Sequence, residues 1–251
     1  MTRIVSVVTA VHEPAVAFLV EAYASLAAQV MPAGWGWQWV IQEDGTTGRP
    51  RDVLPDDSRI SFDVGRPLGQ GIARTYALAR AGGELVKVLD ADDALAPGAL
   101  AREIDVLSEH GDIGWTTCRA LDRCDDGSTR EFTGAPSGGR LDRGQVLAAW
   151  LADEHRLPVH PATLCIRRDL LLALGGWMAL PAGEDTGLLL AADAVSPGYF
   201  IDQVGQFYRK WPGQVTADPA HTEPVEWTAR NAVIEERART LAVMFPTGWP
   251  R

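Results

Sequence analysis

Short apolar runs alternate with helical patterns along the first hundred residues, and this alternation limits the fold of the chain more than any other feature. Runs rich in Val, Ile and Leu are typical of strands buried on both faces of a sheet. Such strands are predicted at Ile4–Ala10, Trp37–Gln42, Arg59–Val64 and Leu85–Leu89. Helices are expected between them and after them, beginning at Pro14, Gly69 and Pro97. Repeated strand–helix–strand units predict an α/β fold with a Rossmann-like, mostly parallel central sheet flanked by helices.

The second half of the chain is less regular. The expected elements are a hairpin of 113–121 and 129–132, a helix at 143–151, a strand at 162–167, a short helix, a turn at 175–177, a helix from Glu184, a strand at 204–211 and a helix at 223–243. No internal repeat or linker separates these elements. We therefore expect residues 1–251 to form one domain.

Composition excludes several classes of protein. A net charge of −10 argues against a nucleic-acid binder, because neutralising phosphates requires clustered Lys and Arg. Cys118, Cys124 and Cys165 are odd in number and form no C-x-x-C pair, which indicates reduced thiols and a cytoplasmic location. No apolar run approaches the ~20 residues of a spanning helix. We expect no stable membrane insertion.

Polar residues follow three of the predicted strands, at Val11–Glu13, Glu43–Gly45 and Asp90–Asp93. Open parallel sheets bind ligands just beyond the carboxyl ends of their strands. Asp90 and Asp92 are two residues apart on an extended segment, so their side chains can converge on one point. Mg²⁺ or Mn²⁺ would relieve the repulsion between them, whereas a solvated turn with a helix-capping Asp explains the same spacing.

The surroundings of this triplet resemble a known family. Residues Gly69–Asp93 contain a glycine loop, an Ala-Arg-Thr helix, a Gly-Glu turn and a strand ending in Asp-Ala-Asp-Asp. This order is similar to the central signature of family 2 glycosyltransferases, which usually have Asn in place of Thr75. Val40–Thr47 resembles the family's Val-Asp-Asp-Gly-Ser-Thr element, and Tyr208–Gly213 resembles its Tyr-Arg…Pro-Gly element.

Two further elements extend the resemblance from about Ile4 to Thr216. Gly175-Gly-Trp177, followed by Glu184-Asp185, is similar to the family's Gly-Gly-Phe…Glu-Asp element. The first strand ends in Ala-Val-His-Glu, where the family has Pro-Thr-Tyr-Asn. The resemblance implies a GT-A fold and a UDP, GDP or dTDP sugar as donor. It also implies a nucleotide-binding half at about 1–93, a less regular acceptor-binding half at about 94–216 and a C-terminal helix at about 217–251.

The resemblance assigns nucleotide contacts to residues at the strand ends. Asp44 matches the family's contact to the base, although an Asp before glycine is also an ordinary turn residue. His12 stands where the family's Tyr packs against the base, and a loop histidine with no such role is the alternative. Ala10 and Ala91, in the matched strand-end motifs, complete this part of the expected nucleotide site.

Two arginines are candidates for the ribose or the diphosphate, because a guanidinium matches phosphate geometry. Arg66 lies in the loop before the Gly69 helix, and Arg74 lies one turn into that helix. Arg74 could instead pair with a buried acid such as Glu43 or Asp90.

The carboxylates receive their roles from the same resemblance. Asp92 aligns with the usual metal ligand, Asp90 with a residue that contacts ribose or metal, and Asp93 with a helix cap or acceptor-side residue. Asp185 matches the catalytic base of an inverting transfer, and Glu184 would orient it or the acceptor. The alternative is a pair of acids favoured by a helix start. The implied cofactor is Mn²⁺ or Mg²⁺.

Several aromatic and basic residues are open to two interpretations. The residues that could contact sugar or donor, or be ordinary core and strand-end residues, are Trp35, Trp37, Trp39, His160, Pro161, Trp177, Arg209 and Trp211.

The function expected is an inverting, metal-dependent glycosyltransferase acting on a small-molecule or glycan acceptor. A haloacid-dehalogenase-like phosphatase is disfavoured because Ala94 stands two residues after Asp92, where that class has Thr or Val. A nicotinamide dehydrogenase would need a glycine-rich turn after the first strand, where the chain has Val11-His-Glu-Pro14. A non-catalytic nucleotide-sugar-binding protein stays open.

Overall fold

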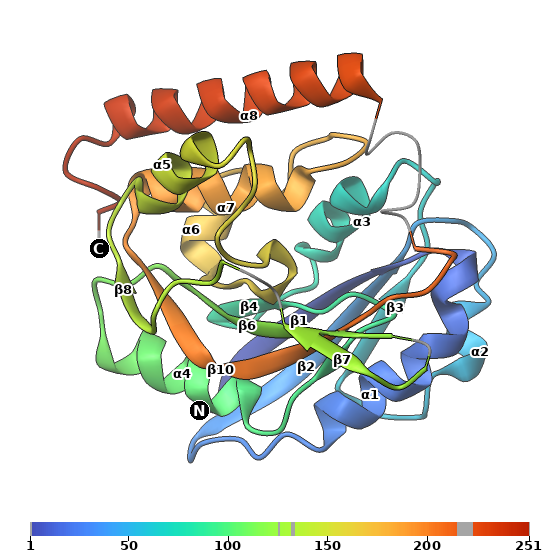
Figure 1. Ribbon diagram of the computed structural model, residues 1–251. Helices are drawn as coiled ribbons and strands as arrows, with labels where there is room; N and C mark the ends of the chain where they lie inside the picture. Colours follow the sequence, from blue (N-terminus) through green and yellow to red (C-terminus); the bar gives the residue numbers. More distant parts are fainter. Residues whose placement is uncertain (1, 125, 132–133, 215–222, 251) are drawn as a thin grey trace.

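A computed structural model describes residues 2–124, 126–131, 134–214 and 223–250 (Figure 1). The strands are β1 (Arg3–Val11), β2 (Trp35–Glu43), β3 (Ile60–Asp63), β4 (Leu85–Val88), β5 (Ala94–Leu95), β6 (Trp115–Arg123), β7 (Thr129–Glu131), β8 (Gly139–Leu141), β9 (Cys165–Arg167) and β10 (Gly198–Arg209). The α-helices are α1 (Leu19–Ala27), α2 (Pro50–Val53), α3 (Gln70–Ala77), α4 (Ala99–Glu109), α5 (Gln145–Ala152), α6 (Arg168–Ala173), α7 (Glu184–Val195) and α8 (Pro224–Met244). Two 3₁₀ helices, η1 (Glu13–Phe18) and η2 (Pro161–Thr163), complete the elements.

The strands form one sheet in the order β3-β2-β1-β4-β9-β6-β10-β5, with β7 on β6 and β8 on β10. The first four neighbours pair in parallel, as the alternating pattern predicts. Strand β9 then enters antiparallel between β4 and β6, and β10 runs parallel to β6. The mostly parallel character is therefore confined to the first half and to the β6–β10 pair.

Helices cover both faces of the sheet (Figure 1). One core joins the sheet to α3, α5, α6, α7 and α8 and contains Trp115 and Trp150. The other core joins it to α1 and α4 and contains Trp37 and Trp39. The core interpretation is confirmed for these last two tryptophans, while Trp35 is half-buried with the Arg3 guanidinium 4.0 Å from its ring centroid.

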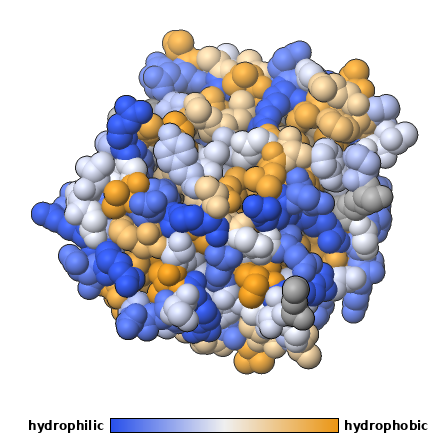
Figure 2. Space-filling view, turned by 180° about the vertical axis from the view of Figure 1, so that it is seen from behind, coloured by the Kyte–Doolittle hydropathy of each residue, from blue (hydrophilic) through white to orange (hydrophobic). Residues whose placement is uncertain are grey.

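The long helix α8 lies across α5 and α7 at one side of the molecule (Figure 1). The opposite view shows apolar residues in small groups among hydrophilic ones (Figure 2). Within the described part of the chain, no helix is both long enough and apolar enough to cross a membrane.

The elements expected in the second half are present, with shifted bounds. The hairpin is formed by β6 and β7, although Asp125 and Phe132 lie outside the described residues. The strand expected at 162–167 begins only at Cys165, because Pro161 starts a 3₁₀ turn there instead. The short elements α2, β5 and β8 were not predicted.

Candidate functional site

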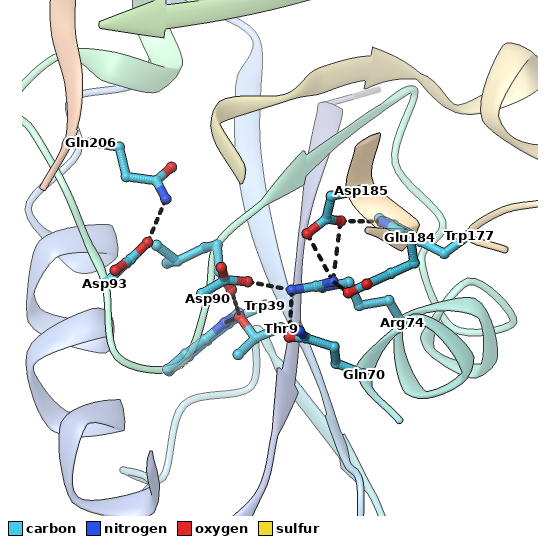
Figure 3. A network of polar contacts seen from close by, with 11 residues as sticks. Thr9, Trp39, Gln70, Arg74, Asp90, Asp93, Trp177, Glu184, Asp185 and Gln206 are labelled. Atoms are coloured by element: carbon cyan, nitrogen blue, oxygen red, sulfur yellow. Dashed lines mark hydrogen bonds and ion pairs between the residues drawn. The ribbon is translucent and has the colours of Figure 1, made fainter. Parts of the chain in front are cut away.

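A cavity of about 400 Å³ opens at the edge of the sheet where β1 and β4 end. Because these two strands are parallel neighbours, their carboxyl ends meet at one place. The cavity brings together seven of the residues predicted to form the site: Ala10, His12, Asp90, Ala91, Asp92, Glu184 and Asp185. The strand ends are also joined by side chains, since Thr9 Oγ1 donates to Leu89 O at 2.7 Å and accepts from Trp39 Nε1 at 2.8 Å (Figure 3).

Arg74 joins Asp90 on one side of the site to Glu184 and Asp185 on the other (Figure 3). Its side chain is 1% exposed, and it donates to Asp90 Oδ1 at 2.5 Å, Glu184 Oε1 at 2.9 Å and Asp185 Oδ1 at 3.1 Å. Burial lowers the pKa of Arg74, but the three carboxylates outweigh this and raise the pKa above its ordinary value. Of the two pairings considered for Arg74, the one with Asp90 is confirmed, whereas Glu43 bonds to the loop after β2.

Asp185 lies in the first turn of α7, after a glycine N-cap at φ 76°. Its Oδ1 also accepts from Trp177 Nε1 at 2.7 Å. Burial raises the pKa of Asp185 to about 7, and Glu184 and Asp90 add to this effect while Arg74 and Trp177 oppose it. A carboxyl group that ionises near neutral pH is suited to general-base catalysis.

Glu184 is 2% exposed and packs against α3. A side chain at Gly71 would meet Glu184 Cγ at 2.8 Å, so a glycine at this position allows α3 and α7 to approach closely. The second glycine of the Gly-Gln-Gly loop therefore has a packing reason, and the close approach brings Glu184 to Arg74.

The other carboxylates of the triplet are held by β10 and the residues after it. Asp92 Oδ2 accepts from Trp211 Nε1 at 2.6 Å, and Asp92 O accepts from Arg209 Nε at 2.9 Å. Asp93 is buried and accepts from Gln206 Nε2 at 2.7 Å and from the Arg209 backbone N–H at 2.9 Å. The helix-cap interpretation of Asp93 is wrong, because α4 begins after Gly98, whereas Asp93 fastens the strand end to β10.

The described protein groups at the cavity could supply only part of the coordination shell of a metal ion. Among the residues that the structure describes, no cluster of three or more His, Cys, Asp or Glu is arranged to hold a metal ion. Asp92 faces the cavity, while Oδ1 of Asp90 is taken by Arg74. Because Mg²⁺ and Mn²⁺ take one or two protein carboxylates together with substrate phosphates, this donor set fits an ion whose coordination a diphosphate would complete.

Three predicted nucleotide contacts, Asp44, Arg66 and Arg74, are not among the described residues that line the cavity. Asp44 Oδ1 accepts from the backbone N–H groups of Leu68 at 2.8 Å and Gly69 at 3.0 Å. This carboxylate therefore shapes the loop that leads into α3, and its contact with a base stays a prediction. Arg66 lies in that loop and is exposed.

The far wall of the cavity comes from a segment that the sequence only partly indicated. His160 and Pro161, two of the candidate acceptor contacts, line it, and burial lowers the pKa of His160 to about 4. Further lining residues, for which no individual role was predicted, include Gln70, His155, Arg156, Leu157, Ala162, Thr186, Tyr208 and Gln214. The backbone of Glu154 and His155 has positive φ, 47° and 65°, which is uncommon for residues other than glycine and has no sequence signature here.

Comparison with solved structures identifies the class of fold. The chain is similar to crystal structures of S. aureus TarS in complex with UDP-GlcNAc (TM-score 0.67, 18% identity, covering 87% of this chain and 61% of that chain) and with UDP (TM-score 0.61, 18% identity, covering 84% and 61%). The fold is that of GT-A glycosyltransferases, as the sequence predicted. The sequence model of the family described as "Glycosyl transferase family 2" matches residues 6–167. The chain belongs to this family of enzymes.

A second relative supports the same family. An uncharacterized glycosyltransferase of Nostoc sp. is 36% identical over 80 residues, which are 30% of this chain and 25% of that protein. The chain thus spans a quarter of the Nostoc protein and 61% of the TarS chain.

Proposed function

We propose that the protein is an inverting, metal-dependent glycosyltransferase that moves a sugar from a nucleotide-diphosphate sugar to an acceptor hydroxyl. The observation that carries the proposal is that Asp92 and Asp185, from distant parts of the chain, line one cavity. The titles of the TarS structures name UDP-GlcNAc and UDP, which supports a nucleotide sugar as donor and favours UDP over GDP and dTDP.

In this proposal Asp185 takes the proton from the acceptor hydroxyl as its oxygen attacks the anomeric carbon. Glu184 and Arg74 hold the base in place by the contacts described above. A divalent ion, bound through Asp92 and the diphosphate, would stabilise the negative charge of the leaving group. A single base on one face of the sugar, with the diphosphate on the other, gives inversion.

The remaining residues of the cavity divide by position. Ala10, His12 and Ala91 lie at the strand ends and would contact the nucleotide, while His160 and Pro161 would contact a small-molecule or glycan acceptor. One continuous sheet carries strands from both the nucleotide half and the acceptor half, which supports assigning the two halves to a single domain. A cytoplasmic location rests on the three free thiols, and cell fractionation tests it.

The role of Asp185 is tested by D185N. We expect donor affinity to be kept and turnover to fall by at least ~10²-fold, the usual cost of losing a general base. D169N is a matched control, because Asp169 is an exposed carboxylate at the start of α6. Unchanged turnover in D185N would remove Asp185 from this role.

The role of Asp92 is tested by calorimetry with UDP and Mn²⁺. We expect D92A to weaken the metal-dependent part of UDP binding, and an identical metal titration in the variant and the parent would refute the assignment. Donor binding by the parent without turnover over a broad panel of acceptors would support a non-catalytic nucleotide-sugar-binding protein instead.

A further inference from the structure

Each of the two carboxylates central to the proposed reaction accepts a hydrogen bond from a tryptophan. Trp177 Nε1 lies 2.7 Å from Asp185 Oδ1, and Trp211 Nε1 lies 2.6 Å from Asp92 Oδ2. Such short distances are typical of hydrogen bonds to an ionised acceptor. Both carboxylates line the cavity, whereas neither tryptophan is among its described lining residues. The two indoles therefore contact the carboxylates from behind.

The backbone of Trp177 is fixed by α3. Its N–H donates to Thr75 Oγ1 at 3.2 Å, and Thr75 Oγ1 lies 3.4 Å from Trp177 O. The preceding Gly176 has φ 75°, a conformation that favours glycine. Trp177 as a whole is 4% exposed. Thr75, the position at which the chain departs from the family pattern, therefore helps to place the indole that contacts Asp185.

Trp211 is fixed by packing. Its ring meets Phe18 edge-on, with the centroids 5.0 Å apart. A Cβ at Gly213 would lie 2.1 Å from the Trp211 ring, so the chain can close over this indole only with glycine at that position. The Trp-Pro-Gly sequence after β10 thus holds the ring against η1 and directs its N–H to Asp92.

We propose that Trp177 and Trp211 are positioning residues whose indole N–H groups fix the rotation of the Asp185 and Asp92 carboxylates. A carboxylate turns about its Cβ–Cγ bond, and a donor behind it selects one orientation. Misplacement of a reacting group by about 1 Å can cost ~10²-fold in rate, and loss of a partner behind a metal ligand costs ~10–100-fold in affinity. This inference rests on the proposed function and adds to it two residues that act through the carboxylates.

The two bonds should have separable effects. The Trp177 hydrogen bond favours the ionised form of Asp185, so W177F should shift the acidic limb of kcat/KM to higher pH, by about one unit. The charged groups that face Asp185 are Arg74 from α3, Glu184 from α7 and Asp90 after β4, and all three are kept in this variant. W211F should leave the acidic limb in place and weaken Mn²⁺ binding in the presence of UDP by ~10-fold or more.

The test measures both quantities in both variants, so that each variant is the control for the other. Mn²⁺ affinity is measured with UDP and no acceptor by calorimetry, and the pH profile is measured with donor and acceptor. Crossed effects, with one quantity changed in each variant, support the proposal. Two variants that match the parent, or that change both quantities alike, overturn it.

Two substitutions that keep both indoles serve if a Trp-to-Phe variant does not fold. T75V keeps the indole but loosens the Trp177 backbone, and a smaller shift of the acidic limb in the same direction is expected. G213A displaces the Trp211 ring and should lower Mn²⁺ affinity. If the parent turns over and binds Mn²⁺ in the presence of UDP, but T75V and G213A match it in both measurements, the role of the indoles is overturned and the proposed function stands. A parent without metal-dependent UDP binding overturns the proposed function as well.

Discussion

Replacing Arg74 by Met should destabilise the protein strongly and in a pH-dependent way. The guanidinium is 1% exposed, and its three carboxylate partners are at most 19% exposed, so water can do little to replace it. Removing one member of a buried ionic network typically costs ~3–5 kcal/mol, because the remaining charges stay buried and unpaired. This is a large part of the ~5–15 kcal/mol by which a domain is stable.

The pH dependence follows from Asp185. Its folded-state pKa is raised to about 7, above the ordinary 3.8, so its ionisation makes the parent lose stability as pH rises from about 4 to about 7. Without Arg74 the folded-state pKa rises further, and the loss continues to higher pH. The gap between parent and R74M should therefore grow between about pH 6 and about pH 8.5, by ~1.4 kcal/mol for each additional pKa unit.

Urea unfolding at these two pH values measures the gap, and R80M is the matched control. Arg80 is half-buried and donates to Ser61 Oγ, Ile41 O and Gln42 Oε1, and none of these acceptors is a carboxylate. R80M should be destabilised by a similar amount at both pH values. A gap for R74M that is below ~1 kcal/mol, or equal at both pH values, would refute the charge-balancing role of Arg74.

Three further predictions concern the core. K87M should lower the free energy of unfolding in urea by ~3–5 kcal/mol, because Lys87 Nζ lies 2.6 Å from buried Glu103 and the variant leaves that carboxylate unpaired. Adding E103L should recover much of this loss, and a double variant no more stable than K87M would contradict the reasoning. D193A should lower the melting temperature more than D193N does, because buried Asp193 accepts from a backbone N–H at the start of α5 through each of its two oxygens, and Asn keeps one of these acceptors. Burial raises the pKa of Asp193 to about 7, so its ionisation destabilises the parent between about pH 4 and pH 7, and D193N should flatten this dependence. G198A should cost ~1–3 kcal/mol by calorimetric melting, since its Cβ would lie 2.2 Å from the Trp115 ring, and a variant as stable as the parent would show that the strand can shift.

The sequence predicted those parts of the fold that local patterns determine. The buried runs of β1, β2 and β4 and the acids at their ends are readable because period and composition act within a few residues. The two-residue strand β5 has no such pattern, since it exists only because β10 supplies its partner. Likewise the helix expected from Pro14 begins as the 3₁₀ helix η1, a difference that local propensity does not decide.

The polar contacts of the site show the same limit. The strand-end acids could be named, but two of the three carboxylate partners of Arg74 lie 110 and 111 residues away on α7, and Trp211 is 119 residues from Asp92. A sequence identifies the residue types that can form such contacts without stating which of them meet. The sequence therefore does not decide between a phosphate and an acid as the partner of Arg74. It predicts Trp177 and Trp211 as ligand contacts or as core and strand-end residues, with no indication that their indoles contact the two carboxylates.

The place of β10 in the sheet has a consequence for synthesis of the protein. Among the described residues, β10 alone covers one long side of β6, and β10 ends at Arg209, so this strand edge stays open while the nascent chain leaves the ribosome. A fragment ending at residue 167, where the family match stops, would keep β4 and the acids Asp90–Asp93 that follow it. It would lose Asp185 and also β10, which covers β6. Such a fragment should aggregate through that edge.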